Sequence, residues 1–449
     1  MRVKSKNSNS KTQFQWSQEE ASKPERTIVL VPEFSSSRFS DGGNVRRSPA
    51  SRLEEAEGLA RAISLDIIYS DIVKLKMMRP SSLFGRGKID EIADIIHDMD
   101  IGLAIVDHSL SPVQQQNLEE KWNCKVLDRT GLILEIFGER AQTKEGRLQV
   151  DLAHLNYLKG RLVRAWTHLE RQRGGAGFMG GPGETQIESD RREIQSKILG
   201  LKKDLEKVKR TRSLHRAQRK KIPHPVVALV GYTNAGKSTL FNKLTGAKVF
   251  AKDLLFATLD PTLRQLNLPE GTRVIISDTV GFVSNLPTHL VAAFSATLEE
   301  VLEAELILHI RDIADPDSQA QSDDVYDILS QLGISDNGRK GVFEIWNKID
   351  LLTPDALEAM RQVKTAKGAP LLVSAVTGEG NSELLSLIED RIAGSNKVIE
   401  LILELEDLGR LPWFYENTNI IERNDLEDGR VSLKVRASHS AKEELNSFL

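Results

Sequence analysis

The sequence predicts an α/β protein whose centre is a P-loop domain with a doubly wound, mostly parallel sheet. Three observations predict it. A G-x-x-x-x-G-K-S loop at 231–238 stands between an apolar run and an amphipathic segment. Further nucleotide motifs follow in order, most of them directly after an apolar run. Strand-like and helix-like segments also alternate before the loop, which predicts a small α/β domain there. A helical hairpin is expected between that domain and the P-loop domain, and a small α+β domain after it.

Composition places the chain among ordinary globular proteins. It has 449 residues, of which 40% are hydrophobic and 28% charged, with a net charge of −3. This length predicts several domains, and the overall charge does not favour nucleic acid. The single cysteine, Cys124, excludes an internal disulfide and is expected to be a small core residue.

Targeting signals are not found. No apolar run approaches the length of a membrane span, and residues 1–25 lack the hydrophobic core of a secretory signal. Residues 1–25 are rich in serine, lysine and glutamine, so a disordered tail is expected there. We therefore expect a monomeric, cytoplasmic protein.

Residues 26–140 are predicted to form the small parallel α/β domain. Strands are expected at 27–31, 66–69, 103–106 and 126–127, and helices at 51–63, at 88–96 and from Ser111. Ser51 and Ser111 are candidate N-caps, the second followed by Pro112. The glycine-rich turn at 85–88 ends in Lys88 but lacks a full phosphate loop. A surface turn is favoured over a second phosphate site. Contact of this turn with an RNA phosphate is an intermediate interpretation.

Residues 141–222 are predicted to form an antiparallel helical hairpin. Leucines recur at helical spacing over 148–162, and a second apolar stripe runs over 194–208. The tip, residues 167–186, is long and rich in glycine, so it is either functional or disordered. Residues 191–221 carry 13 Lys or Arg against 3 Asp or Glu, a net charge of +10. Nucleic acid is the favoured partner over simple solvation, with RNA-contact candidates Arg171, Arg173 and Phe178, and Trp166 as a further stacking candidate.

The GTPase domain is expected at 223–395, and its phosphate loop explains the predicted chemistry. Successive backbone N–H groups of the loop can point at phosphate oxygens, at the positive end of the following helix. Lys237 should reach the β- and γ-phosphates, and the Ser238 hydroxyl should hold Mg²⁺. Taken alone, the pattern could still be a glycine-rich turn that binds nothing. The loop residues are Gly231, Tyr232, Thr233, Asn234, Ala235, Gly236, Lys237 and Ser238.

Four further motifs make GTP the predicted ligand. Asp278 and Gly281 should lie near the metal and the γ-phosphate, and with Lys237 they are the catalytic candidates. Asp350 can accept hydrogen bonds from the N1–H and 2-amino groups of guanine, which adenine lacks in that place. Thr258 is a second candidate metal ligand, ordered when a γ-phosphate is present. The predicted nucleotide-binding segments are Phe256, Ala257, Thr258, Leu259 and Asp260; Asp278, Thr279, Val280 and Gly281; Asn347, Lys348, Ile349 and Asp350; and Ser374, Ala375 and Val376.

Two positions bear on how GTP would be hydrolysed. Many GTPases place a glutamine directly after Asp-x-x-Gly to orient the attacking water, and here that position is Phe282. Slow intrinsic hydrolysis is therefore expected, with the missing group supplied by rearrangement or by a partner. Asn234 could coordinate K⁺ facing the nucleotide or could simply stabilise the loop, and the sequence leaves both open.

Residues 396–449 are predicted to form a small α+β domain with no chemistry of its own. Strands are expected at 398–403 and 431–435, a hairpin turn at Asp428 and Gly429, and a closing helix over 440–449.

These motifs resemble the HflX family of translational GTPases. The specific points are the runs at 181–192, 147–155 and 255–262, together with the phosphate loop and the motif at 278–281. The resemblance implies binding to the large ribosomal subunit and its rRNA, nucleotide-dependent splitting of stalled ribosomes, GTP hydrolysis stimulated by the ribosome, and often tolerance of ATP. Ala176, Phe178 and Met179 stand where relatives tend to be more polar or basic, so tip contacts can differ. The competing functions are a ribosome-assembly GTPase acting on rRNA and a switch acting on a protein effector.

Overall fold

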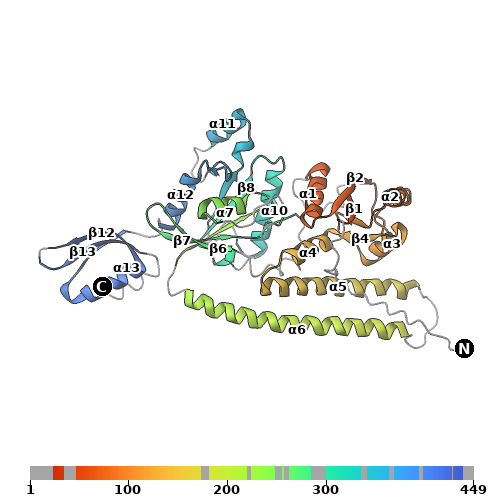
Figure 1. Ribbon diagram of the computed structural model, residues 1–449, viewed down its shortest axis with the longest axis horizontal. Helices are drawn as coiled ribbons and strands as arrows, with labels where there is room; N and C mark the ends of the chain where they lie inside the picture. Colours follow the sequence, from red (N-terminus) through yellow and green to blue (C-terminus); the bar gives the residue numbers. More distant parts are fainter. Residues whose placement is uncertain are drawn as a thin grey trace.

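The computed structural model arranges the chain as a row of β-sheet units along its long axis, with two long helices beneath (Figure 1). Residues 1–23 of the predicted tail, residues 173–181 of the tip and the closing helix at 440–449 lie outside the described residues. The structure describes residues 24–34, 47–172, 182–219, 224–247, 255–256, 262–284, 300–334, 341–363, 369–393, 398–426 and 428–437.

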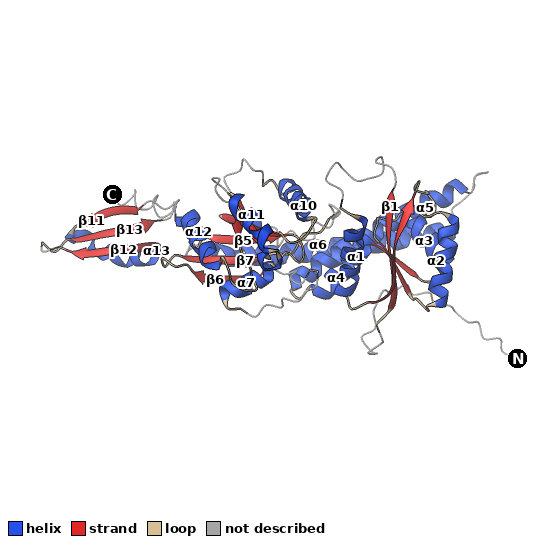
Figure 2. Ribbon diagram, turned by 90° about the horizontal axis from the view of Figure 1, so that it is seen from above, coloured by secondary structure: helices blue, strands red, loops and turns tan. Residues whose placement is uncertain are grey.

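The first unit is a parallel sheet with helices on both faces, as the sequence predicts. Its strand order is β2-β1-β3-β4. Alternate residues of β1 face opposite ways, so Val29 packs with α1 and α4 while Leu30 packs with α2 and α3 (Figure 2). The elements are β1 (Arg26–Phe34), α1 (Pro49–Ala62), β2 (Asp66–Leu75), α2 (Arg86–Asp98), β3 (Leu103–Val106), α3 (Pro112–Trp122), β4 (Lys125–Asp128) and α4 (Arg129–Arg140).

Two details of this unit differ from the prediction. Helix α1 is capped by Ser48, whose hydroxyl accepts from the Ser51 N–H at 3.0 Å, so Ser51 lies in the first turn and is not the cap. The cap is again a serine followed by a proline, as at Ser111, where the capping box is present as predicted. Helix α4 was not predicted at all; Asp128 caps it.

The long helices α5 (Lys144–Gln172) and α6 (Pro182–Arg219) lie side by side and antiparallel, which confirms the predicted hairpin (Figure 1). Ile198 and Leu205 of the predicted stripe are buried. Asp128 joins the hairpin to the first sheet, because it accepts from the Tyr157 hydroxyl at 2.6 Å and from Arg161 at 2.7 Å.

The central unit is a six-stranded sheet of order β10-β9-β8-β5-β7-β6, in which β6 alone of the described strands is antiparallel. This is the predicted doubly wound, mostly parallel sheet. Its elements are β5 (Val226–Gly231), α7 (Lys237–Thr245), β6 (Thr262–Asn267), β7 (Arg273–Asp278), β8 (Leu306–Asp312), α10 (Ser318–Gln331), β9 (Val342–Asn347), η3 (Ile349–Leu351), α11 (Pro354–Val363), β10 (Leu371–Leu372) and α12 (Asn381–Ala393).

The last unit is an antiparallel sheet of order β11-β13-β12, packed against a short helix. Gly429, with φ +87°, lies between β12 and β13, where the hairpin turn was predicted. Within the described part of the chain, no helix is long and apolar enough to cross a membrane. The elements are β11 (Val398–Leu403), η4 (Leu405–Arg410), α13 (Leu411–Asn417), β12 (Thr418–Asp425) and β13 (Val431–Ala437).

Candidate functional site

The predicted phosphate loop connects the carboxyl end of β5 to the amino end of α7, at the edge of the sheet where ligands of this fold bind. Two glycines are required by its geometry. Gly231 has φ +154°, and a Cβ there would overlap the carbonyl of Ile310. Gly236 has φ +92°, and a Cβ there would overlap the Asn347 amide. The loop can therefore wrap tightly only with glycine at both places.

Lys237 is held at the mouth of this loop. Its Nζ donates to the carbonyls of Gly231 and Tyr232, at 3.1 and 2.7 Å. Burial lowers the pKa of Lys237 to about 8, against the opposing effect of the Asp278 carboxylate. The Lys237 ammonium group thus lies beside the loop backbone, where bound phosphate oxygens would be an anionic partner for it.

The segment 278–281 lies against the loop from the neighbouring strand β7. The Ser238 hydroxyl donates to Asp278 Oδ2 at 2.7 Å, so the predicted metal ligand Ser238 lies beside the carboxylate that was expected near the metal. Thr279 is buried, and its hydroxyl donates to the carbonyl of Leu229. A Cβ at Gly281 would lie 2.9 Å from Thr233 and 3.0 Å from Lys237 Nζ, so only glycine fits there.

The backbone of Phe282 is hydrogen-bonded to the loop, and its side chain lies in the apolar core. Its N–H donates to the carbonyl of Gly231 at 3.1 Å, and its carbonyl accepts from Thr233 at 2.7 Å. The ring is 2% exposed and belongs to the apolar cluster that also contains Phe137 and Phe256. This side chain therefore has neither the chemistry nor the position to orient a water.

At the predicted base-binding end, the Asn347 side chain ties three segments together. Its Nδ2 donates to the carbonyl of Ala235 at 2.8 Å, and its Oδ1 accepts from the Ala375 N–H at 3.0 Å. Asp350 Oδ1 accepts from the Ser374 hydroxyl at 2.5 Å, which orients the carboxylate. Motifs separated by over a hundred residues are thereby assembled at one edge of the sheet.

Some of the remaining predicted nucleotide and RNA-contact residues are described by the structure, and the others are not. Lys348 has φ +66° and pairs with Asp312 at 2.7 Å, Ile349 is buried, and Val376 is 69% exposed beside the predicted base site. Phe256 is described and buried against Phe137. Ala257, Thr258, Leu259 and Asp260 lie outside the described residues, as do Arg173 and Phe178, while of Arg171 and Trp166 only the backbone in α5 is described.

The donor set fits Mg²⁺. The ion prefers hard oxygen ligands and keeps several waters, so a site of one hydroxyl and one nearby carboxylate beside phosphates is typical of it. Ser238 and Asp278 provide that hydroxyl and carboxylate. Among the described residues there is no group of three or more His, Cys, Asp or Glu that could hold a metal without a nucleotide.

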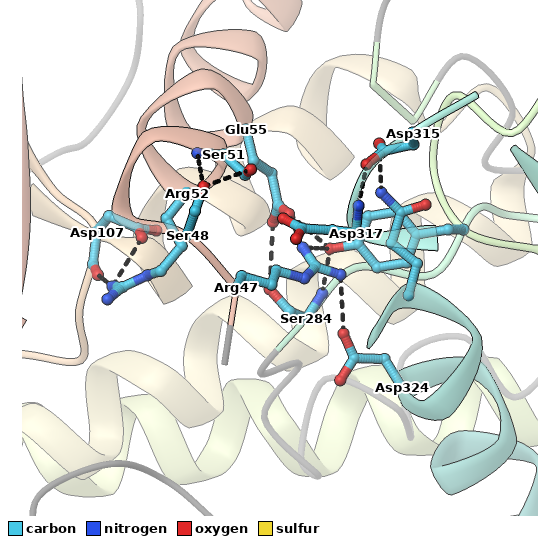
Figure 3. Close-up of polar contacts among 12 residues, drawn as sticks. Arg47, Ser48, Ser51, Arg52, Glu55, Asp107, Ser284, Asp315, Asp317 and Asp324 are labelled. Atoms are coloured by element: carbon cyan, nitrogen blue, oxygen red, sulfur yellow. Dashed lines mark hydrogen bonds and ion pairs between the residues drawn. The ribbon is translucent and has the colours of Figure 1, made fainter. Parts of the chain in front are cut away.

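Sequence reasoning missed a polar cluster that joins the phosphate loop to the first unit. Tyr232 was predicted as a nucleotide residue, but its hydroxyl donates to Glu55 of α1 at 2.6 Å. Arg47 pairs with Glu55 and, at 2.9 Å, with Asp324 of α10; Figure 3 shows it between these two carboxylates. These partners are far apart in the sequence, so no local pattern could indicate them.

The glycine-rich turn at 85–88 behaves as a surface turn. Gly85 is the N-cap residue of α2, and Lys88 Nζ pairs with Asp71 at 2.9 Å and with Glu91 at 2.8 Å. Because two carboxylates already neutralise this lysine, a second phosphate site here is disfavoured, as expected.

Comparison with known proteins gives four matching family models along the chain. They are described as GTP-binding GTPase N-terminal (residues 50–138), GTP-binding GTPase middle region (140–219), 50S ribosome-binding GTPase (226–348) and HflX C-terminal domain (359–449).

Individual relatives match over most of their length. The chain is 48% identical to GTPase HflX of Magnetococcus marinus over 376 residues, covering 84% of this chain and 86% of the relative. It is 43% identical to GTPase HflX of Escherichia coli over 385 residues, covering 86% and 89%. Among solved structures, a GTP-binding protein of Sulfolobus solfataricus in complex with GDP matches with a TM-score of 0.43 at 22% identity, covering 82% of this chain and 98% of that one.

Proposed function

We propose, from the premise that the chain belongs to the HflX family of GTPases, that it binds the large ribosomal subunit and uses GTP binding and hydrolysis to split or recycle stalled ribosomes. Family membership and fold make the chain a P-loop GTP hydrolase that binds guanine nucleotide. The observation that carries the ribosomal proposal is the match of residues 226–348 to a family described as 50S ribosome-binding GTPases.

The nucleotide roles follow from the contacts at the sheet edge. We assign the phosphates to the loop 231–238, with Lys237 on the β- and γ-phosphates and the Gly281 N–H on the γ-phosphate. The guanine is assigned to Asp350, whose carboxylate is oriented by Ser374, and to the 374–376 backbone. Asn347 supports this site by holding the loop and that backbone in register.

We assign Mg²⁺ to Ser238 and Thr258 as ligands, with the Asp278 carboxylate near the ion. Bound there, the ion would neutralise charge on the β- and γ-phosphates. For Asn234, φ is +60°, a region that asparagine adopts more readily than most residues, which supports a loop-forming role. Coordination of K⁺ by its side chain is the second proposal for this residue, and exchange of K⁺ for Na⁺ tests it.

The buried Phe282 supports a cycle in which the partner completes the site. In this cycle the GTP state binds the large subunit, intrinsic hydrolysis is slow, and contact with the ribosome supplies or rearranges the group that positions the water. Hydrolysis then releases the protein.

Helix α6 supports an RNA partner. Its residues Arg191, Lys202 and Lys203 are exposed, and the stripe residues Ile198 and Leu205 are buried, so the basic face is available. We propose that this face lies along rRNA and that the tip carries the specific contacts, with Arg171 and Arg173 on phosphates and Phe178 stacked on a base. Such binding should weaken steeply with salt.

The decisive experiment measures GTP hydrolysis by the full chain with and without purified large subunits, with small subunits as control. A second arm replaces residues 171–178 by a Gly-Ser linker, and a third combines Lys202→Gln with Lys203→Gln. Arg361→Gln, an exposed arginine of α11 far from the hairpin, is the matched control for the charge changes.

The proposal expects strong stimulation by large subunits, lost with the linker, while the free protein keeps its GDP affinity. If large subunits do not stimulate hydrolysis, a switch acting on a protein effector is favoured. If precursor subunits stimulate and mature ones do not, assembly is favoured. Loss of GDP affinity with the linker would assign the tip to the nucleotide site.

The separate units of the fold support separate roles for the domains. We propose that residues 26–140 and 141–222 form the ribosome-directed domains, 223–395 the GTPase domain and 396–449 a small accessory domain. Ribosomes place this activity in the cytoplasm.

A further inference from the structure

Three segments around the proposed phosphate site reach into the first α/β unit. They are the loop residue Tyr232, the segment after Gly281, and the pair Leu255 and Phe256. The Phe256 ring meets Phe137 of α4 edge to face, with centroids 4.9 Å apart, and Leu255 packs on Gly58 of α1. The first unit therefore contacts three segments that flank the proposed phosphate site.

The polar part of this contact is the Glu55 cluster, which we define as Arg47, Glu55, Arg129, Tyr232 and Ser284. Glu55 pairs with both arginines through its two oxygens. It also accepts from the Tyr232 hydroxyl at 2.6 Å and from the Ser284 hydroxyl at 3.3 Å. The side chains of Glu55 and both arginines are 9% exposed, so these contacts are shielded from water.

Ser284 is held by its backbone as well as its side chain. Its N–H donates to the Tyr232 hydroxyl at 2.8 Å, and its carbonyl accepts from Arg129 Nη2 at 3.1 Å. Two residues earlier, Phe282 is bound to the loop through its own N–H and carbonyl. The short stretch that begins at Gly281 is thus fixed from two sides, by the loop and by the first unit.

Glu55 is ionised in spite of its burial. Burial acts to raise the pKa of Glu55, but Arg129 and Arg47 outweigh it and the net pKa is lowered. Arg129 has Asp107 as a second carboxylate partner, and Arg47 has Asp324. Arg52 also pairs with Asp107, so three arginines face three carboxylates. The charges therefore balance, and the Glu55 carboxylate can hold its four partners at neutral pH.

We propose that Glu55 is a positioning residue for GTP hydrolysis: with Arg129 it holds Tyr232 and Ser284, and through them it sets the direction of the Gly281 N–H. This rests on the proposed role of Gly281 at the γ-phosphate, but not on the ribosomal partner. A preorganised donor is most valuable where charge develops during reaction, so its loss lowers the rate of the chemical step more than nucleotide affinity.

The test uses single-turnover hydrolysis of GTP by the full chain without ribosomes, together with GDP affinity and thermal midpoint. Tyr232→Phe removes the hydroxyl that donates to Glu55 and accepts from Arg47 and from the Ser284 N–H. We expect the rate to fall about five- to tenfold, which corresponds to the weakening of one hydrogen bond, that from the Gly281 N–H to the γ-phosphate. GDP affinity should stay within about twofold, since the loop backbone is unchanged.

Glu55→Gln gives the second arm, and the double variant gives the third. Both changes act through one network. The hydrolysis rate of the double variant should therefore be only slightly lower than that of the less active single variant. Glu57→Gln is the matched control: it lies on the same helix and binds Ser70 and Arg61 within the first unit, so its hydrolysis rate should equal wild type.

Two outcomes would overturn the proposal. An unchanged or increased rate in Tyr232→Phe and Glu55→Gln would show that the cluster does not position the reacting segment. A parallel fall in rate, GDP affinity and thermal midpoint would show that it only supports the fold. Lys237→Ala in the same assay tests the nucleotide site itself, and missing stimulation by ribosomes would leave the result of this test unaltered.

Discussion

Replacing Phe282 by glutamine separates two explanations of slow intrinsic hydrolysis. In the GTPases that use a glutamine after Asp-x-x-Gly, that side chain orients the water. Here the phenylalanine ring is 2% exposed in the apolar cluster shared by the first unit and the central sheet. Phe282→Gln should therefore place its amide in this cluster and not at the γ-phosphate, so that no fast GTPase results.

The expected loss of stability follows from this burial. Removing a buried phenylalanine ring from the core forfeits about 1.5–3 kcal/mol of transfer free energy. A buried amide without partners costs about 1–3 kcal/mol more. The sum, about 2.5–6 kcal/mol, corresponds to a fall of about 5–24 °C in thermal midpoint for a unit of this size. Phe282→Leu keeps the site apolar, so it should cost less stability than Phe282→Gln and leave the hydrolysis rate unchanged.

Thermal melts and single-turnover hydrolysis of both variants provide the measurement. The backbone bridge of Phe282 to Gly231 and Thr233 is available to either variant, so differences report on the side chain. A stable Phe282→Gln variant whose hydrolysis is accelerated more than tenfold would refute this reasoning. It would mean that the side chain at this position faces the nucleotide and that water positioning was the only missing element.

Lys237→Ala removes the charge that faces the β- and γ-phosphates and should abolish hydrolysis; full turnover would contradict the site assignment. Asp350→Asn should weaken GTP binding and favour xanthine nucleotides, because an amide can donate to the 2-oxo group, and unchanged GTP affinity would rule the guanine assignment out. Hydrolysis in K⁺ should exceed that in Na⁺ at equal ionic strength if Asn234 holds a cation, whereas equal rates would leave only its loop role. Burial lowers the pKa of His309 to about 4. Between about pH 6.5 and 4 this histidine is therefore protonated in the unfolded chain but neutral in the folded protein. The free energy of unfolding should therefore fall by up to about 3 kcal/mol between pH 6.5 and 4, and His309→Phe, which keeps the ring contact with Tyr326, should flatten that dependence in urea titrations at several pH values.

The parts of the fold that sequence reasoning predicted have strong local signals. The central strands are short apolar runs that end in nucleotide motifs, and α3 begins with a serine, a proline and a capping glutamine. Helix α4 was missed because it has no polar face to reveal a period: Leu132, Ile133, Leu134, Ile136 and Phe137 are all buried. A helix that is buried on nearly all sides shows neither the period of an amphipathic helix nor the alternation of a strand, so its sequence pattern does not reveal it.

The candidate site was predicted to the extent that it is made of backbone motifs. Its support was not, because Glu55 and Tyr232 are separated by 177 residues, and Glu55 and Ser284 by 229. The sequence assigned Tyr232 to the nucleotide on its place in the loop, and the structure shows that its side-chain hydroxyl binds Glu55 of the first unit. A loop residue can thus offer its backbone to the phosphates and its side chain to another unit, and motif spacing reports only the first.

The charged character of the Glu55 cluster indicates what it contributes. Buried ion pairs are seldom the cheapest way to stabilise an interface, since the desolvation of the charges offsets much of their attraction. The neighbouring contact of Phe256 with Phe137 already buries apolar surface between the same units. Apolar contacts change little in energy on small rotations. The bonds of Tyr232 to the Ser284 N–H and of Arg129 to the Ser284 carbonyl, in contrast, fix the two peptide groups on either side of Ser284. Direction is what a γ-phosphate donor three residues away requires, so the cluster is better explained by the position it imposes than by the stability it adds.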